Sequence, residues 1–142
     1  GQAIDRVGVM LSLNFPAGPE LEKLSEKSNA VFKIKPSMKN TDCSLSGVEN
    51  KCKKMLTENY EKSDIALFCI DSVIAALDGM YKALMPKYGA LPVVFSGGVT
   101  SNKRIKNYFH DKYNAIFAEP AFSADNAAGT AVLSSIMYDR RK

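Results

Sequence analysis

The beginning of the chain predicts two short helices separated by a break. Apolar residues of the opening stretch recur at helical spacing, and the segment "NFPAGP", residues 14–19, then ends the helix with two prolines and a glycine. A second helix is predicted after Pro19, because acidic residues fill its first turn and Leu21 and Leu24 fall on one side. The first helix depends on the apolar positions Ile4, Val7, Met10 and Leu11.

The next stretch predicts a strand, a turn, a second strand and a helix. Side chains alternate between apolar and basic over Phe32–Lys35, and the run then stops at a proline, which is typical of a half-exposed strand. The segment "DCSLSG", residues 42–47, is the expected partner strand, closed by its glycine, and "PSMKNT" is the expected turn between the two. A helix is predicted from Val48 to about Leu56.

The second half of the chain predicts a long core helix followed by a repeated strand and helix pattern. Residues from Ser63 to about Tyr88 are apolar on most sides of a helix, and Pro86 is expected to end it about one residue earlier. A strand at 91–98, a helix at 100–113, a strand at 115–120 and a helix from 123 follow. This order indicates parallel strands joined by a right-handed crossover, and therefore an α/β fold.

Composition limits the size and the environment of the protein. The chain has 142 residues, of which 46% are hydrophobic and 24% charged, so it holds one core or at most two thin lobes. Its net charge of +4 comes from dispersed lysines and a basic tail, which is weak evidence for nucleic acid. Three cysteines without a Cys-x-x-Cys pair, no signal peptide and no apolar run approaching a membrane span predict a reduced, cytoplasmic chain.

The chain contains a single histidine, His110, on a lysine-rich stretch that is predicted to be an exposed helix face. A zinc site needs more ligands than this one residue supplies, and a Ser-His-Asp or Cys-His set would also have to include it. We therefore predict a solvated histidine and no catalytic side chain in this chain.

Two neighbouring strand ends carry candidate binding residues. In open α/β sheets, ligands gather at the carboxyl ends of the strands, where helix N-termini present free N–H groups. The first end holds Gly97 and Gly98, which permit close approach of a ligand, with Thr100 or Ser101 as the expected helix cap. Asn102 is then expected in the first helical turn with a donor and an acceptor free for a ribose or phosphate. Tight turns without a ligand have the same pattern.

The second strand end carries a candidate metal ligand. Ser123 is the expected helix cap, which places Asp125 in the first turn, where an ionised carboxylate is favoured. Compensation of the helix dipole alone also explains an acid at this position. Together, the two strand ends predict half of a cleft for a nucleotide, with the other half expected from another lobe.

Four segments of the chain, in order, resemble the tRNA threonylcarbamoyladenosine transferase family, historically labelled O-sialoglycoprotein endopeptidase. They are "GQAIDRVGVMLSLNFPAGPELEKL", "DCSLSGVENK", "VVFSGGVTSNKRI" and "SADNAAG". They are similar to the family's Gly-Glu-Ala-Phe-Asp-Lys-Val and Tyr-Pro-Gly-Gly-Pro segments, its Phe-Ser-Phe-Ser-Gly-Leu-Lys, its Gly-Gly-Val-x-x-Asn-Arg and its Thr-Asp-Asn-Ala-Ala. The resemblance covers essentially the whole chain.

The resemblance implies one lobe of an actin-like ATPase (ribonuclease H-like) fold and a set of site residues. Residues 1–142 would be a single C-terminal lobe, with a helical and hairpin insert region at 1–60 and the long helix and strand-helix core at 61–142. Asp125 would be a ligand of a divalent metal, iron or zinc. The implied contacts to an adenine nucleotide are Asp5, Gly18, Glu22 and Asn102, with Gly97 and Gly98 in the same wall.

The resemblance also implies a reaction and partners. The family transfers threonylcarbamoyl from threonylcarbamoyl-AMP to N6 of an adenosine in tRNA, and no protein nucleophile is required. Its implied partners are tRNA and other subunits of the tRNA-modification complex, and a homodimer through an exposed lobe face is also expected. The family's His-x-x-x-His metal ligands and Ser-Gly-Gly phosphate loop belong to an N-terminal half without a counterpart in this sequence.

Three departures from the family pattern leave alternatives open. Glu49 stands where the family usually has Lys, while Ala17 and Ala124 replace the commoner Gly and Thr. The chain is therefore either a fragment that is inactive alone, or a diverged non-catalytic paralogue that binds nucleotide or docks a partner. A kinase or ATPase of the same fold is a third hypothesis, for which the sequence offers no obvious base.

Overall fold

The computed structural model describes residues 1–89 and 91–119. They form a small mixed α/β structure that is mostly helical and has short strands. The chain divides into two compact units, Gly1–Leu91 and Pro92–Lys142.

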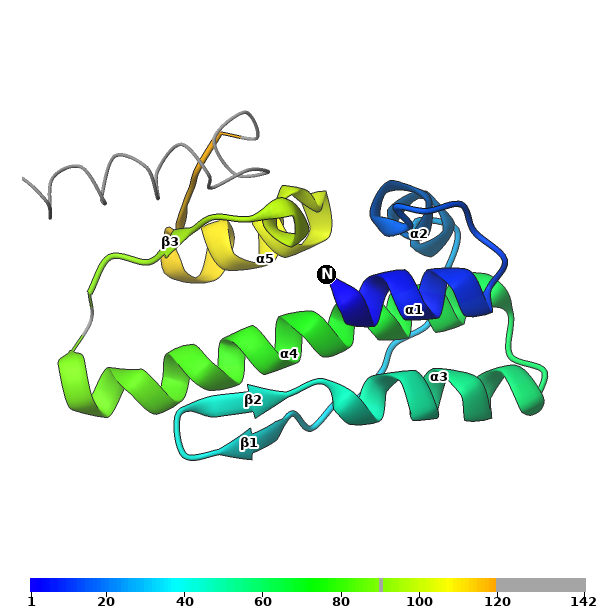
Figure 1. Cartoon of the computed structure of the whole chain (residues 1–142). Helices are drawn as coiled ribbons and strands as arrows, with labels where there is room; N and C mark the ends of the chain where they lie inside the picture. Colours follow the sequence, from blue (N-terminus) through cyan, green and yellow to red (C-terminus); the bar gives the residue numbers. More distant parts are fainter. Residues whose placement is uncertain (90, 120–142) are drawn as a thin grey trace, which may run out of the picture. The chain divides into compact units, whose positions relative to one another are not determined.

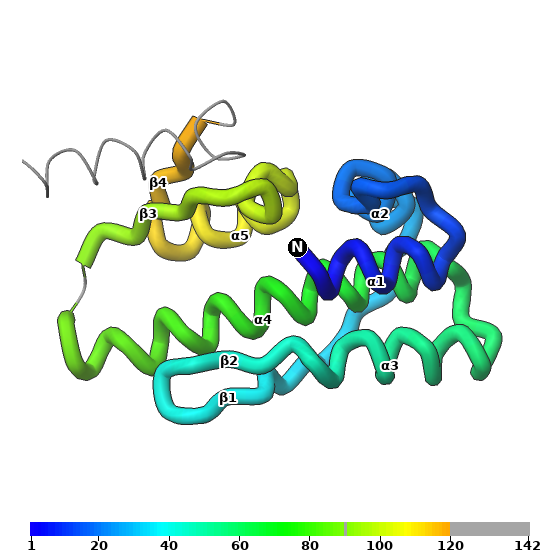
Figure 2. Tube along the Cα trace, viewed as in Figure 1, coloured from blue at the N-terminus to red at the C-terminus, as the bar shows by residue number. Residues whose placement is uncertain are grey.

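The long helix α4 (Lys62–Tyr88) forms the core of the first unit. It contacts α1 (Gln2–Met10), α2 (Gly18–Ser25), α3 (Ser46–Thr57) and the hairpin of β1 (Ser37–Lys39) and β2 (Asp42–Ser44). In Figures 1 and 2, α1 and α2 lie above α4, and α3 and the hairpin lie below it. The first half of α4 buries its apolar residues, as predicted for a core helix: Ile65, Ala66, Leu67, Ile70, Val73, Ile74 and Ala76.

The two N-terminal helices form where the apolar spacing predicts them. In α1, Ile4 and Val7 are buried on one face, and Leu11 is buried directly after the helix. In α2, Pro19 lies in the first turn, where its missing N–H costs no hydrogen bond, and Leu21 is fully buried.

The predicted pairing of Phe32–Lys35 with residues 42–47 is wrong. That segment is extended and alternates between half-buried and exposed residues, but among the described residues it pairs with no other strand. The hairpin instead uses Ser37–Lys39, inside the predicted turn, against Asp42–Ser44, because the chain reverses at Asn40, whose φ of 56° is left-handed. Alternation fixes which side chains point inward, whereas the position of the turn fixes the pairing.

Two helix boundaries differ from the sequence prediction. α3 begins at Ser46 and includes Gly47, which was expected to close the preceding strand. α4 continues through Pro86 to Tyr88 and ends at Gly89, whose φ is 75°. The proline removes only the hydrogen bond to the carbonyl of Lys82, an exposed residue in the last turns, where water can replace the lost donor.

The second unit is a strand-helix-strand arrangement, as predicted, although both strands are shorter than the predicted 91–98 and 115–120. The strands β3 (Val94–Phe95) and β4 (Ile116–Phe117) pair in parallel, with Val94 opposite Ile116. The 3₁₀ turn η1 (Gly98–Ser101) and the helix α5 (Lys103–Tyr113) connect them. Phe109 of α5 is buried against Phe95, with ring centroids 4.8 Å apart, and thereby fixes the helix on the sheet. The predicted helix from Ser123 lies outside the described residues.

Candidate functional site

Asp5 positions the loop that leads into α2. Its carboxylate Oδ1 accepts a hydrogen bond from the backbone N–H of Ala17 at 3.1 Å, twelve residues later in the chain. Asp5 is half-buried on α1, and Ala17 is the N-cap residue of α2. Two segments that carry predicted nucleotide contacts, Asp5 and Gly18, are therefore brought next to each other.

Gly18 is the first residue of α2 and adjoins open space. A Cβ atom at this position would have no heavy atom within 4 Å. The preceding residue provides no side-chain cap, and Pro19 has no N–H. The backbone N–H groups of Gly18 and Glu20, which make no hydrogen bond among the described residues, are therefore the ones available to a ligand. Glu22 lies four residues further along α2, on the same side as Gly18, and is half-buried. These three predicted residues, Asp5, Gly18 and Glu22, belong to one local region.

The loop before Gly18 has a second carboxylate anchor at Glu20. The Asn14 side chain donates to Glu20 Oε1 at 2.9 Å, and the Asn14 backbone N–H donates to Oε2 at 3.0 Å. The side-chain bond first, and the backbone bond second, lower the pKa of the Glu20 carboxyl below its ordinary value. Sequence reasoning noted this residue only as an acid in a first helical turn, because its partner is defined by the path of the loop.

Ala17, one of the departures from the family pattern, has a structural explanation. Its side chain is fully buried and packs against Gly8 of α1. A Cβ atom on Gly8 would overlap the Cβ atom of Ala17. The methyl group of Ala17 therefore points into the packing of α1 against the loop and does not enter the open space beside Gly18.

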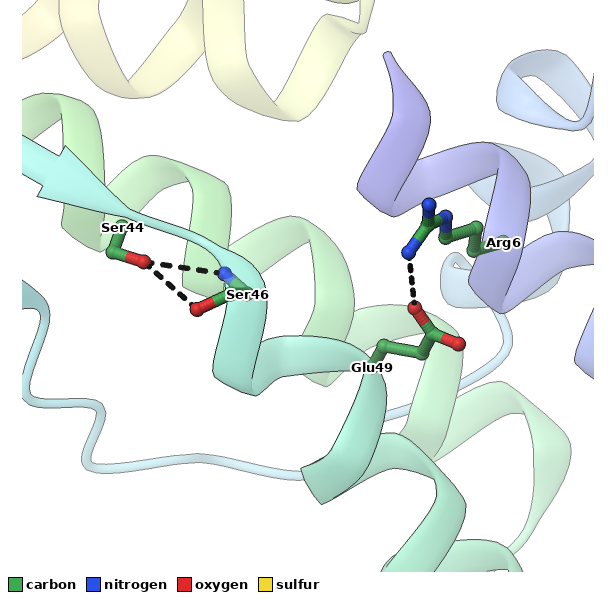
Figure 3. A network of polar contacts seen from close by, with 4 residues as sticks. All are labelled: Arg6, Ser44, Ser46 and Glu49. Atoms are coloured by element: carbon green, nitrogen blue, oxygen red, sulfur yellow. Dashed lines mark hydrogen bonds and ion pairs between the residues drawn. The ribbon is translucent and has the colours of Figure 1, made fainter.

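Glu49, a second departure, is paired with Arg6. Figure 3 shows the Arg6 guanidinium of α1 next to the Glu49 carboxylate of α3, with Nη1 and Oε2 3.2 Å apart. The two side chains are 65% and 41% exposed, so the pair contributes little to stability. It nevertheless gives the acidic residue at position 49 a partner. The same figure shows the Ser44 and Ser46 hydroxyls 2.9 Å apart at the start of α3.

The glycine turn of the second unit has its own geometry. Gly97 adopts φ 109° and ψ 157°, a conformation that strongly favours glycine. The buried Thr100 closes the turn, because its hydroxyl donates to the carbonyl oxygen of Gly97 at 2.7 Å. Gly98 begins the 3₁₀ turn, and a Cβ atom there would have no neighbour within 4 Å.

Asn102 is the helix cap that the sequence assigned to Thr100 or Ser101. Its side-chain oxygen accepts a hydrogen bond from the backbone N–H of Ile105 at 3.1 Å, so that prediction was wrong. The cause is the 3₁₀ turn at 98–101, which delays the start of α5 until Lys103. The oxygen of Asn102 is thus already used within the protein, and only its amide group makes no hydrogen bond among the described residues.

The predicted site residues fall into two groups. Asp5, Gly18 and Glu22 lie in the first unit, while Gly97, Gly98 and Asn102 lie in the second. Their roles in binding stay predictions. Asp125, the predicted metal ligand, lies outside the described residues, as does Ala124.

Residues 1–89 and 91–119 contain no group of three or more His, Cys, Asp or Glu side chains that could hold a metal ion. His110 is 67% exposed at its side chain, which confirms the prediction of a solvated histidine. The described residues do not by themselves supply the ligands of a metal centre. In this same part of the chain, none of the helices combines the length and the apolar character that crossing a membrane requires.

Comparison with known proteins connects these features to one family. Residues 1–132 match the family model described as TsaD, tRNA N6-adenosine threonylcarbamoyltransferase. The matched range includes every predicted site residue, and it covers far more than half of the chain.

Relatives with the same description come from bacteria and archaea. The chain is 29% identical over 152 aligned residues to the tRNA N6-adenosine threonylcarbamoyltransferase of Kosmotoga olearia, and the alignment covers 100% of the chain. It is 31% identical to that of Thermococcus kodakarensis and 32% identical to that of Buchnera aphidicola, with 97% of the chain covered in each case. The alignments cover 45%, 44% and 45% of these relatives, so the chain spans less than half of their length.

Proposed function

The chain belongs to the tRNA N6-adenosine threonylcarbamoyltransferase family, and from this premise we propose that it forms the nucleotide-binding half of such an enzyme's active site. The proposed reaction is transfer of threonylcarbamoyl from threonylcarbamoyl-AMP to N6 of an adenosine in tRNA. Because the chain spans less than half of its relatives, the complete activity is assigned to a longer protein or assembly. We expect the chain alone to be inactive in transfer.

The hydrogen bond from the Ala17 N–H to Asp5 carries this proposal. It holds the N-terminus of α2 next to Asp5 and leaves open space at Gly18. Free N–H groups at a helix N-terminus favour the anionic phosphate of a nucleotide, and a carboxylate nearby can accept hydrogen bonds from a ribose. The proposed ligand is therefore an adenine nucleotide: the adenylate part of threonylcarbamoyl-AMP, or ATP or ADP.

The proposed chemistry relies on positioning. N6 of the tRNA adenosine attacks the carbamoyl carbon, and AMP is the leaving group. Holding the two reactants in the correct geometry removes much of the entropic barrier of this bimolecular step. The proposed nucleotide contacts of the first unit are Asp5, Gly18 and Glu22. Those proposed for the second unit, taken by itself, are Gly97, Gly98 and the side-chain NH2 of Asn102.

A divalent metal, iron or zinc, would supply charge stabilisation and help to position the donor. Asp125 is the only ligand that we propose from this chain, and a single carboxylate does not make a metal site. The same proposal gives the chain an actin-like ATPase fold and places it in the C-terminal half of the enzyme. It also includes the other subunits of a tRNA-modification complex as partners.

The proposal is tested by calorimetry of the chain with ATP and ADP. Gly18→Ala adds a methyl group into the open space at the start of α2, where it meets no protein atom, so the fold is expected to be unchanged. Gly47→Ala in α3 is the matched control, because a Cβ there also has no neighbour within 4 Å. We expect Gly18→Ala to weaken nucleotide binding at least tenfold and Gly47→Ala to leave it unchanged. Equal nucleotide binding by both variants, or no binding by the unmodified chain, would refute the proposal that the chain forms the nucleotide-binding half of an active site.

A further inference from the structure

Residues 31–39 form an extended segment with strictly alternating exposure. Odd-numbered residues from Val31 to Lys39 are exposed, and even-numbered residues from Phe32 to Met38 are half-buried. The exposed side therefore carries Lys33 and Lys35, which we call the lysine ridge. On an extended chain, the Cα atoms of these two residues are about 6.6 Å apart, since each residue advances about 3.3 Å.

The inner side of the segment is anchored on the first half of α4. The Ser28 hydroxyl, just before the segment, donates to Asp64 Oδ1 at 2.5 Å. One turn further along α4, the Phe68 ring meets the Phe32 ring edge to face, with centroids 5.4 Å apart. In Figure 2, the light-blue tube between α2 and β1 passes behind α4 on its way to the hairpin.

Gly79 provides the anchor on the second half of α4. A Cβ atom on Gly79 would lie 2.9 Å from Met38 Sδ and 3.2 Å from Pro36 Cγ, so the segment touches the helix backbone where a side chain is missing. From Asp64 to Gly79, the anchors extend over about 22 Å of helix, at about 1.5 Å per residue. The lysine ridge is thus held in a fixed, extended geometry before any partner binds.

The outer side of the segment carries unpaired charges, and the backbone groups of the segment are unpaired as well. Within the described part of the chain, neither Lys33 nor Lys35 has an ion-pair partner. The backbone groups of residues 31–36 make no hydrogen bond among the described residues either. Lys39, by contrast, lies opposite an acidic residue, Asp42, in the register of the hairpin.

Two explanations fit an unpaired extended segment with lysines. Lysine and proline on a strand edge prevent pairing with another chain, and this protective role needs no ligand. The phosphates of a nucleic acid are also held by lysine side chains together with backbone N–H groups, and both kinds of group lack a partner here among the described residues. The second explanation accounts for both the regular lysine spacing and the rigid anchoring on α4.

We propose that the lysine ridge and the adjacent backbone N–H groups of residues 31–35 bind the phosphate backbone of the substrate tRNA. The proposal rests on the proposed function, which brings tRNA to this protein, and it assigns part of the tRNA contact to the first unit. Contacts of this kind position the RNA without reading its sequence. The ridge would therefore contribute to affinity for any tRNA.

The test is fluorescence anisotropy of labelled tRNA with the chain at several salt concentrations. Each phosphate contact adds about 0.7 to 0.9 to the slope of log K against log salt concentration. We expect Lys33→Ala/Lys35→Ala to reduce this slope by about 1.4 to 1.8. The control variant Lys51→Ala/Lys53→Ala removes the same charge from exposed positions of α3 and is expected to reduce the slope less than half as much. Circular dichroism melting checks that both variants fold as the unmodified chain does.

Three outcomes would overturn the proposal. They are no binding of tRNA by the chain at low salt, equal slopes for the two double variants, and ridge-dependent binding of an acidic peptide with no binding of tRNA. Failure of the proposed function is distinguishable, because it is measured separately as nucleotide binding. If the chain binds tRNA through the lysine ridge but does not bind nucleotide, the tRNA-binding proposal stands and the nucleotide-binding proposal is refuted. The reverse result would refute only the ridge.

Discussion

The methyl group of Ala17 fills the space that Gly8 leaves open on the buried face of α1. Both residues are buried, and a Cβ atom on Gly8 would overlap the Cβ atom of Ala17. The contact fixes the distance between α1 and the loop that precedes Gly18. It lies next to the hydrogen bond from the Ala17 N–H to Asp5, so packing and hydrogen bonding hold the same loop.

Gly8→Ala is expected to destabilise the first unit by at least about 2 kcal/mol, because overpacking a rigid contact shifts backbone. Ala17→Gly in the Gly8→Ala background is expected to recover much of this loss, although Ala17→Gly alone is destabilising. Urea unfolding of the two single variants and the double variant measures the coupling. Additive free energies of unfolding would show that the two side chains do not share this space.

Acidification is expected to loosen the loop before Gly18. The pKa of Glu20 is lowered in the folded chain by its two hydrogen bonds from Asn14, so this contribution to stability is present above the ordinary carboxyl pKa and is lost as the pH falls below it. The amide resonance of Asn14 in NMR spectra should therefore shift below about pH 4.5, the ordinary value. In Glu20→Gln this titration should be absent. A titration of Asn14 that survives the substitution would assign the effect to another group.

Asn102 variants separate its role in capping from a role in binding. Asn102→Ala removes the acceptor for the Ile105 N–H and is expected to cost about 1 kcal/mol of stability. Asn102→Asp keeps an acceptor at the cap and replaces the amide group, so it should retain most of the stability. If the amide contacts a nucleotide, both variants lose affinity in calorimetry. Loss of affinity in Asn102→Ala alone would indicate that the cap matters and the amide does not.

The three cysteines are expected to react in a fixed order. Cys52 and Cys69 are fully buried on α3 and α4, and the neighbouring Cys52 thiol together with burial raises the pKa of the Cys69 thiol. Cys43, on β2, is partly exposed. Iodoacetamide should therefore label Cys43 in the folded chain, and the other two only in denaturant, as read by mass spectrometry. Rapid labelling of Cys52 or Cys69 under native conditions would contradict the buried packing.

The sequence predicted those parts of the fold that depend on local periodicity. The core helix follows from its long apolar pattern, and the strand-helix-strand unit follows from the order of short apolar runs and an amphipathic stretch. The structure confirms both. The prediction of a paired strand at Phe32–Lys35 was wrong because the alternation of apolar and basic residues reflects burial, whereas strand pairing depends on the left-handed turn at Asn40. The prediction of the helix cap was wrong because a short 3₁₀ turn moves the start of α5 to Lys103. Several consecutive polar residues fit a cap equally well, so the sequence alone does not choose among them.

The sequence identifies the candidate site residues, but it does not predict which contacts they make in the folded chain. The family motifs identify Asp5 and Gly18, yet nothing in the sequence says that Asp5 accepts from the Ala17 N–H, since that depends on how α1 packs against the loop. The compensating packing of Gly8 and Ala17 is hidden for the same reason. A glycine inside a predicted helix, such as Gly79, is a local signal of close approach, but its partner becomes visible only in the folded chain.

Gly79 is also expected to couple the opening of the β1–β2 hairpin to the unfolding of the last turns of α4. A glycine in the interior of a helix costs up to about 1 kcal/mol relative to alanine, so the end of α4 is intrinsically weak and relies on the contact with Pro36 and Met38. Opening of the hairpin segment should then release the last turns of α4 in the same event. Amide hydrogen exchange would register this as one shared opening free energy for residues 80–88 and the β1–β2 pair, with the first half of α4 exchanging more slowly.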